Sequence, residues 1–345
     1  MARERIISPK EQSADTEPAL SEATPESTPD SSSPSIRPKT LDQYLGQAEL
    51  RERLSVALEA AKVRNDPMEH VLLYGPPGLG KTTLAYVIAN ELGTRAWVTS
   101  GPALTKGSDL VGTLTRMEPG DVLFIDEIHR LPAAVEEYIY PAMEDYKIDF
   151  TLDSGMHARV VTYALQPFTL IGATTRAGLL TGALRSRFGI VHNIRFYETD
   201  ELTSILQQAM SKLEMPPVND GSLQCIASRS RGTPRIALRL LRRVRDFSQV
   251  RCKNVFDSSV VDEALKLEGI DDAGLDTLDR TYLETLATVY EGGPAGVEAI
   301  AATMGEDAGT LQDVVEPYLL QAGYVSRTRQ GRKITKLGRT RLKST

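Results

Sequence analysis

Short apolar runs alternate with stretches of helical periodicity through the first half of the chain. Four of these runs predict β-strands, at 71–74, 96–99, 122–126 and 168–173. Helical patterns lie before and between them, at 48–64, 81–92, 107–117 and 132–145. This alternation is typical of a parallel sheet with helices on both faces, so we predict an α/β domain here.

One segment, 147–164, interrupts the alternation. Two short strand patterns at 147–153 and 157–164 flank Ser154 and Gly155, a pair that is typical of a tight turn. We predict a β-hairpin, which either carries a protein contact of its own or forms only the edge of the sheet.

Strand patterns stop near residue 198, and amphipathic helical patterns follow, at 199–213, 219–229, 233–250 and 257–268. A Gly- and Asp-rich break at 269–276 then precedes a last region. Its helical patterns lie at 277–290, 296–303 and 307–321, and they lead into strand patterns at 324–327 and 333–335. Three helices followed by a two-stranded wing suggest a winged helix-turn-helix.

The charge is unevenly distributed. The whole chain of 345 residues has a formal net charge of −6, which on its own argues against a general nucleic-acid binder. Residues 8–35, however, contain six acidic residues, one basic residue, five prolines and eleven Ser or Thr, so we expect 1–35 to be a disordered acidic tail. Residues 327–345 contain eight basic residues and no acidic one. Such asymmetry signals a nucleic-acid or partner contact.

Composition narrows the class of protein. Hydrophobic residues make up 41% of the chain, enough for two or three packed domains. No apolar run approaches the roughly 20 residues that cross a bilayer, and no secretory signal follows the N-terminus. Cys225 and Cys252 have no Cys or His partner nearby in the sequence, so we expect free, partly buried thiols and a cytoplasmic location.

Residues 75–82 read GPPGLGKT and match the phosphate-loop pattern G-x-x-x-x-G-K-[ST]. Glycines let backbone N–H groups surround a phosphate, and the helix that follows directs its positive end at the same anion. Lys81 is expected to reach the β- and γ-phosphates, and the Thr82 hydroxyl to bind Mg²⁺. The alternative is a plain glycine-rich turn, but its place between a strand and a helix favours nucleotide binding.

The strand pattern at 122–126 ends in two acidic residues. Asp126 would lie at the carboxyl edge of the sheet, where it can hold Mg²⁺ through water, and Glu127 can polarise an attacking water. A solvated acidic turn is the alternative, and the nearby phosphate loop disfavours it. For His129 we expect a hydrogen-bonding role rather than a catalytic one.

Four further polar residues follow along the chain, first at a strand end, then in a loop and then at the start of a helix. Thr174 ends the strand pattern at 168–173 and could sense a γ-phosphate. Arg185 and Arg187 lie in the next polar loop, and Arg235 opens the helix at 233–250. Each arginine could also be ordinary surface charge.

These motifs together resemble the AAA+ ATPases and, in detail, the RuvB family, the motors of Holliday-junction branch migration. The strings that carry the resemblance are IRPKTLDQYLGQ (36–47), GPPGLGKTTLA (75–85), LFIDEIHRL (123–131), YPAMEDY (140–146), LIGATTRAG (170–178), RGTPRIALRLLRRVRDF (231–247), GGPAG (292–296) and EPYLLQAGYVSRT (316–328). The resemblance runs from about residue 36 to 332. Ala183 and Ser186 depart from the family, which has a proline and an acidic residue there.

The resemblance implies an AAA+ P-loop ATPase domain over 36–197, a small helical lid domain over 198–268 and a winged-helix DNA-binding domain over 269–345. It implies an ATP- and Mg²⁺-dependent homohexameric DNA translocase that drives branch migration of Holliday junctions in recombination, repair and the SOS response. Its partners would be duplex DNA, RuvA and the RuvC resolvase, with no membrane. Two other classes stay open: a clamp-loader-type AAA+ switch and a winged-helix transcription regulator that uses ATP only as a signal.

Residue roles also carry over from the resemblance. Ile36 and Arg37 would flank the adenine, with Tyr197 on the lid side. The phosphates would be held by Gly78, Gly80, Lys81, Thr82 and Thr83. Glu144, Asp145 and Tyr146 would border the nucleotide pocket.

The remaining roles concern sensing and macromolecular contacts. Thr174 would be the first sensor and Arg235 the second, while Arg187, rather than Arg185, would be the finger inserted into the neighbouring subunit's site. Arg327 and Arg332 on the wing would contact DNA; the alternative is a solvated basic tail. The 147–164 hairpin, with Met156, Val160 and Val161, would dock on RuvA.

Overall fold

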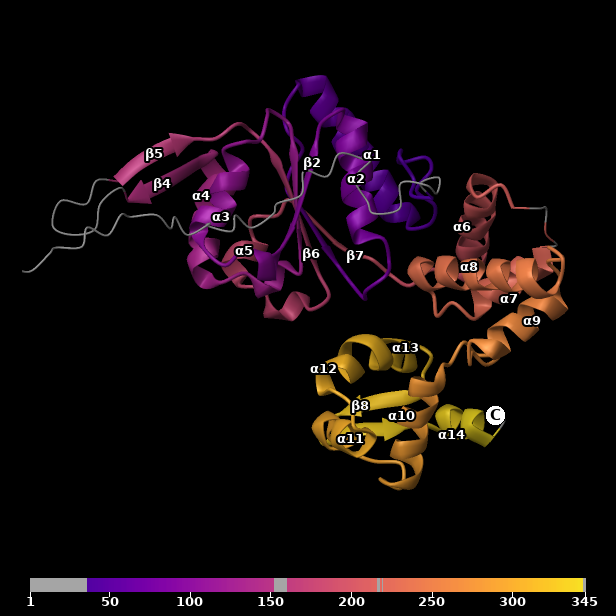
Figure 1. Cartoon of the computed structure of the whole chain (residues 1–345). Coiled ribbons are helices and arrows are strands. Elements are labelled where there is room, and N and C mark those ends of the chain that lie inside the picture. Colours follow the sequence, from indigo (N-terminus) through magenta and orange to yellow (C-terminus); the bar gives the residue numbers. More distant parts are fainter. Residues whose placement is uncertain (1–35, 152–159, 216–217, 219, 344–345) are drawn as a thin grey trace, which may run out of the picture.

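The computed structural model describes residues 36–151, 160–215, 218 and 220–343. Figure 1 shows three parts in chain order: an α/β domain, a bundle of helices beside it, and a small C-terminal domain below both. The acidic tail predicted for 1–35 lies outside the described residues.

Five parallel strands form the sheet of the first domain in the order β2-β3-β6-β1-β7. They are β1 (Val71–Tyr74), β2 (Ala96–Ser100), β3 (Val122–Asp126), β6 (Thr169–Thr174) and β7 (Ile190–Asn193). Tyr74 lies opposite Thr174, and Ile125 opposite Gly172. The carboxyl ends of β1, β3 and β6 therefore meet at one edge, which is where ligands bind in such sheets.

Helices cover both faces of this sheet because its buried strands are apolar on both sides. Helices α1 (Ala48–Arg64) and α2 (Lys81–Leu92) pack on Val71 and Leu73, in one hydrophobic core. On the other face, α3 (Gly107–Leu114) and α4 (Ala133–Asp145) pack in a second core with Leu72. A short helix, α5 (Gly182–Arg185), precedes β7.

The predicted hairpin is present as strands β4 (Lys147–Thr151) and β5 (Val160–Ala164), which pair antiparallel as a separate two-stranded sheet. It extends away from the domain (Figure 1), so it is not an edge of the main sheet. Ser154, Gly155 and Met156 lie outside the described residues, as do the side chains of Val160 and Val161.

The lid consists of α6 (Thr199–Lys212), α7 (Asp220–Ser228), α8 (Pro234–Arg251) and α9 (Ser258–Leu267). Leu240, Leu241 and Val244 form the buried face of α8, as the periodicity predicts, and exposed arginines occupy much of the opposite face. The apolar residues of the lid join the same hydrophobic core as α1 and α2.

The C-terminal domain has a core of its own around Tyr282 and Leu283. Its elements are α10 (Thr277–Thr288), α11 (Val297–Met304), α12 (Ala308–Thr310), a π-helical turn (Leu311–Val315), α13 (Glu316–Gln321), the wing strands β8 (Val325–Thr328) and β9 (Gly331–Ile334), and α14 (Lys336–Lys343). The predicted helices and the two-stranded antiparallel wing are present. Of the eight basic residues in 327–345, four lie in the wing segment, and the other four lie in α14, which contacts α10.

Among the described residues, no helix is long and apolar enough to cross a membrane. Cys225 and Cys252 are free thiols and half-buried, as predicted.

Candidate functional site

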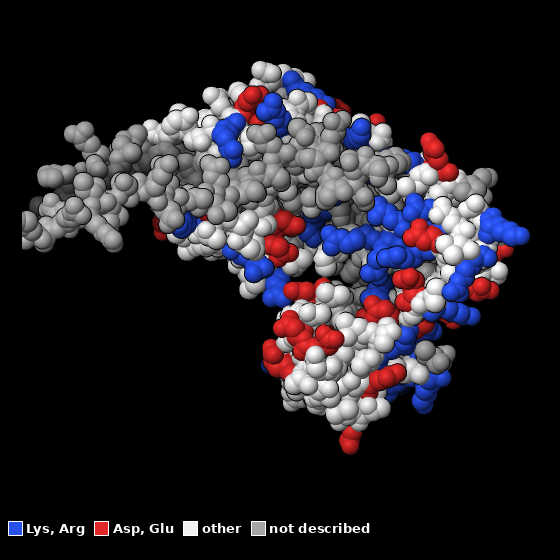
Figure 2. All heavy atoms as spheres, viewed as in Figure 1, with Lys and Arg blue, Asp and Glu red and all other residues white. Residues whose placement is uncertain are grey.

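A cleft of about 1440 Å³ lies between the α/β domain and the lid. Most predicted nucleotide residues line it: Ile36, Arg37, Gly78, Gly80, Lys81, Thr82, Thr83, Asp126, Glu127, Tyr197 and Arg235. Figure 2 shows Lys and Arg side chains gathered around α8. Arg239 and Arg242 of this helix line the cleft. The cleft is therefore positively charged on its lid side, as a polyphosphate site requires.

The phosphate loop joins β1 to α2. Gly80 adopts a φ of 93° directly before α2, a left-handed conformation that favours glycine. A Cβ atom on Gly75 would lie 2.5 Å from the carbonyl oxygen of Ile194, so this position has no room for a side chain. These glycines allow the loop to fold closely around the N-terminus of α2. The N-terminus of a helix carries partial positive charge and binds anions such as phosphate.

Lys81 is the first residue of α2, and its side chain turns back into the loop. Its Nζ donates hydrogen bonds to the carbonyl oxygens of Gly75 and Pro76, both at 2.8 Å. Burial lowers the pKa of Lys81 to about 8, although Asp126 and Glu127 act in the opposite direction. The ammonium group is thus only partly stabilised by the protein, and a bound phosphate would favour its charged form.

The acidic end of β3 lines the same cleft as the loop. Glu127 adopts a φ of 49°, and its backbone N–H donates to Asp126 Oδ1 at 2.9 Å. The Thr82 hydroxyl and the Asp126 carboxylate line the same cleft, and oxygen donors of this kind are the ligands that Mg²⁺ prefers. These two residues fit a magnesium site next to the phosphates.

Thr174 does not line the cleft; it is fully buried behind it. Its Oγ1 lies 2.8 Å from His129 Nδ1, and His129 Nε2 lies 3.4 Å from Glu127 Oε2. Burial lowers the pKa of His129, although Glu127 raises it. His129 therefore has the hydrogen-bonding position that the sequence predicts, and Thr175 is the residue of this strand end that lines the cleft.

The lid contacts the phosphate loop directly. The backbone N–H of Arg235 donates to the Gly78 carbonyl oxygen at 3.3 Å, and the Arg235 side chain lines the cleft. Tyr197 Oη donates to Tyr44 Oη at 3.0 Å, and burial raises the pKa of Tyr197 to about 12, so this pair stays uncharged. These contacts place the first turn of α8 where it can respond to the nucleotide.

The two residues at the start of the described chain close the far end of the cleft. Lys212 Nζ, from the lid, donates to the carbonyl oxygens of Ile36 (3.4 Å) and Arg37 (3.3 Å). The Arg37 guanidinium lies 5.6 Å from the centre of the Tyr86 ring. Ile36 and Arg37 are thus held between both domains, where an adenine ring could lie.

Arg187 and Glu144, which the sequence also assigns to a nucleotide site, lie outside the cleft of their own chain and contact each other. Arg187 Nη2 lies 3.0 Å from Glu144 Oε1, and the guanidinium stacks 4.3 Å above the Tyr140 ring. The Ala183 carbonyl accepts from Arg187 Nη1 (2.6 Å) and from the Ser186 hydroxyl (3.1 Å). The Ser186 hydroxyl and the Arg187 guanidinium therefore share one backbone acceptor in the arginine loop.

Asp145, Tyr146 and Arg185, which are close in sequence to Glu144 and Arg187, also lie outside the cleft. Asp145 is exposed at the end of α4, and Arg185 is exposed at the end of α5. Tyr146 packs edge-on against Phe168, with ring centres 5.9 Å apart. None of these residues borders the cleft of their own chain.

The two wing arginines share one carboxylate. Glu316 is fully buried, and it accepts from Arg327 Nη2 at 2.5 Å and from Arg332 Nε at 2.8 Å. Tyr282 Oη also donates to it, at 3.0 Å. The Arg327 side chain is 52% exposed, but that of Arg332 only 16%. Arg327 can therefore reach a DNA backbone more readily than Arg332.

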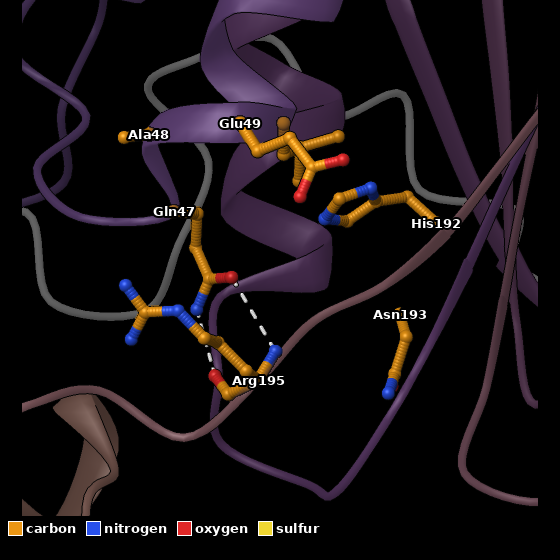
Figure 3. A pocket seen from close by; sticks show the side chains of 7 residues that line it. Gln47, Ala48, Glu49, His192, Asn193 and Arg195 are labelled. Atoms are coloured by element: carbon orange, nitrogen blue, oxygen red, sulfur yellow. Dashed lines mark hydrogen bonds between the residues drawn. The ribbon is translucent and has the colours of Figure 1, made fainter.

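A smaller pocket of about 380 Å³ lies at the start of α1, next to the end of β7 (Figure 3). The Gln47 amide donates to the carbonyl oxygen of Arg195 (2.7 Å) and accepts from its N–H (3.3 Å). Arg195 in turn pairs with Glu201 of the lid at 2.7 Å, while the Glu49 carboxylate points toward the His192 ring. No predicted site residue lines this pocket; Gln47 fixes the segment that leads into the lid.

Sequence reasoning missed several residues of the main cleft. Tyr44, Thr175, Arg239 and Arg242 line it and were not predicted. Arg239 and Arg242 follow Arg235 at helical spacing, so the row was visible in the periodicity of α8.

A parallel sheet that carries a phosphate loop, an acidic strand end and an arginine-bearing helical lid defines a P-loop ATPase of the AAA+ class. Family models agree over nearly the whole described chain. They match the RuvB P-loop domain at residues 36–194, the RuvB AAA lid domain at 197–271 and the RuvB C-terminal winged-helix domain at 272–343.

Individual proteins are similar over the same length. The Holliday junction branch migration complex subunit RuvB of Kosmotoga olearia is 54% identical over 301 residues, covering 87% of this chain and 88% of the relative. The same subunit of Desulfosudis oleivorans is 53% identical over 300 residues, covering 87% of each. The solved Thermotoga maritima RuvB branch migration motor is 50% identical with a TM-score of 0.81, covering 89% of this chain and 98% of that one. The chain belongs to the RuvB family.

Proposed function

We propose that this chain is an ATP-driven motor that moves duplex DNA through Holliday junctions during recombination and repair. One observation carries the proposal: a single chain joins a cleft lined by a phosphate loop and an acidic strand end to a winged-helix domain with exposed basic residues on its wing. The relatives are named for branch migration, which fits this combination. We infer that the units 36–197, 198–268 and 269–345 serve as ATPase, lid and DNA-binding domain, in the cytoplasm.

The residues that line the cleft would have separate roles in ATP hydrolysis. Lys81 binds the phosphates, and Glu127 orients and deprotonates the attacking water. Thr82 and Asp126 would hold Mg²⁺, which neutralises charge on the phosphates when bound. Arg235, whose backbone contacts the phosphate loop, reports occupancy of the cleft to the lid.

We propose that the chain works as a homohexameric ring. Arg187 and Glu144 lie on one surface outside their own cleft, so the arginine can complete a cleft only in a neighbouring subunit. Asp145 and Tyr146 would border that neighbouring site. RuvA would dock at the β4–β5 hairpin, whose separate sheet leaves it free for a partner, and RuvC would act on the same junction.

The experiment that tests the proposal measures ATP turnover and junction movement together. Wild-type protein with RuvA should hydrolyse ATP faster with a four-way junction than with no DNA, and should convert the junction to duplex products. Lys81→Ala should abolish both activities. ATP turnover that ignores DNA, with no junction movement, would favour a clamp-loader-type switch instead.

The variant Arg327→Ala tests the proposed contact between the wing and DNA. One lost phosphate contact should reduce the slope of log affinity against log salt by about 0.9. Basal ATP turnover should stay at the wild-type level, because the wing lies outside the cleft. An unchanged slope would remove Arg327 from the DNA site.

A further inference from the structure

A continuous chain of polar contacts links the hydrolytic carboxylate to the C-terminal domain. Glu127 faces His129, and His129 contacts the Thr174 hydroxyl. That hydroxyl accepts from the backbone N–H of Arg176 at 2.9 Å. The Arg176 guanidinium then binds Asp313 of the C-terminal domain, 137 residues away in the sequence. None of the roles described above uses Arg176 or Asp313.

The contact at Asp313 has the geometry of a specific pair. Arg176 Nη2 lies 2.7 Å from both carboxylate oxygens, and Nε lies 3.1 Å from Oδ1. Planar, two-pronged pairing of this kind fixes orientation as well as distance. Asp313 lies in the π-helical turn Leu311–Val315, and such turns are frequent at functional sites.

Solvent reaches this pair. The side chains of Arg176 and Asp313 are 38% and 44% exposed, so water can replace each partner at modest cost. The pair can therefore open when the C-terminal domain moves, whereas the buried contacts of Thr174 and His129 stay enclosed.

At the other end of this series of contacts, His129 occupies the Glu127 carboxylate. The negative carboxylate favours the His129 tautomer with its proton on Nε2, which faces Glu127 Oε2 at 3.4 Å. The Thr174 hydroxyl then donates to Nδ1 while it accepts from Arg176 N–H. A carboxylate attracted to an imidazole N–H is less available to accept the proton of an attacking water.

We propose that the Arg176–Asp313 pair restrains ATP hydrolysis while the C-terminal domain is docked on the α/β domain, and that displacement of that domain by DNA releases the restraint. The pair holds the backbone of Arg176, which holds Thr174 and His129 against Glu127. When the pair opens, this chain of contacts relaxes and Glu127 turns to the water. Arg176 and Asp313 are positioning residues, and the inference rests on the proposed DNA-motor function.

The test uses full-length protein with ATP and Mg²⁺, with and without a four-way junction. Asp313→Asn should raise basal ATP turnover roughly two- to fivefold, the range of one exposed ion pair. Turnover with DNA should stay at the wild-type level, so the stimulation ratio falls by the same factor. KM for ATP should not change. Arg176→Glu combined with Asp313→Arg should restore the low basal rate.

A matched control removes an exposed pair elsewhere. Glu49→Gln breaks the Arg53–Glu49 contact of 2.6 Å in α1 and should leave both rates unchanged. The inference is overturned if Asp313→Asn keeps the wild-type basal rate, lowers it, or is not reversed by the charge swap. If wild-type turnover does not respond to DNA, the proposed function fails instead, and the basal rates still decide the role of the pair.

Discussion

Replacing Glu316 with glutamine removes the charge that both wing arginines share. Glu316 is fully buried, and Arg332 is only 16% exposed, so Glu316→Gln leaves the Arg332 guanidinium largely buried without a counter-ion. Breaking a buried pair costs about 3–5 kcal/mol. Because Arg327 is 52% exposed and can turn to water, and because glutamine still accepts one hydrogen bond, we expect the loss to be nearer 2–4 kcal/mol.

Hydrogen exchange of the full-length protein, followed by mass spectrometry, reads this loss in the domain where it occurs. At the lower figure of about 2 kcal/mol, amides of α10, α13 and β8 should exchange roughly 30-fold faster than in wild type. Peptides from α1 and α2 should not change, since the C-terminal domain has a core of its own.

The control variant is Glu306→Gln, which removes an exposed acidic residue from the same domain. It should exchange like wild type. If Glu316→Gln also exchanges within twofold of wild type, the shared carboxylate does not stabilise the wing, and the reasoning from burial is refuted.

Three further outcomes follow from the site and its charges. The pKa of Lys81 is lowered to about 8, and phosphate binds the charged form of this side chain. ATP affinity, measured by calorimetry, should therefore weaken as pH rises through about 8. Equal affinities at pH 7 and pH 9 would contradict this prediction. Arg187→Ala and Lys81→Ala should each be inactive alone, but a mixture of the two should regain part of the ATP turnover. In mixed rings, some sites combine an intact Lys81 from one subunit with an intact Arg187 from its neighbour. If Arg187 acted within its own chain, mixing would restore no turnover. Burial raises the pKa of Asp279 to about 7 despite Arg231, so its contribution to stability is present below about pH 4 and lost as pH rises toward 7. The free energy of unfolding of wild type relative to Asp279→Asn should therefore decrease over that interval in denaturant titrations, and a flat difference would contradict it.

The sequence predicted the elements that have a strong period and missed those that depend on distant partners. The four strongly apolar strands and their helices lie where the periodicity places them. Strand β7 was not predicted, because its residues Ile190–Asn193 include two polar ones and it pairs with β1 alone at the sheet edge. Helix α14 was not predicted either, since its basic residues read as a tail; Arg341 instead pairs with Asp271 at 2.8 Å.

The site was predictable to the extent that its chemistry is local in sequence. The phosphate loop and the acidic strand end are contiguous motifs, and parallel strands bring them to the same edge. Glu316 could not be identified as buried, because its partners lie 11 and 16 residues after it and 34 residues before it. The Arg176–Asp313 pair joins two domains and leaves no local signal at either residue.

A second contact to the C-terminal domain determines how that domain can move. Arg231, four residues before Arg235, is 7% exposed and pairs with Asp276 and Asp279, both at 2.6 Å. The short turn from 231 to 235 therefore contacts the phosphate loop at one end and the C-terminal domain at the other. Breaking this buried contact costs several times more than opening the exposed Arg176–Asp313 pair. We expect the C-terminal domain to pivot about Arg231, so that changes at the nucleotide reach the wing through the lid while the exposed pair opens and closes.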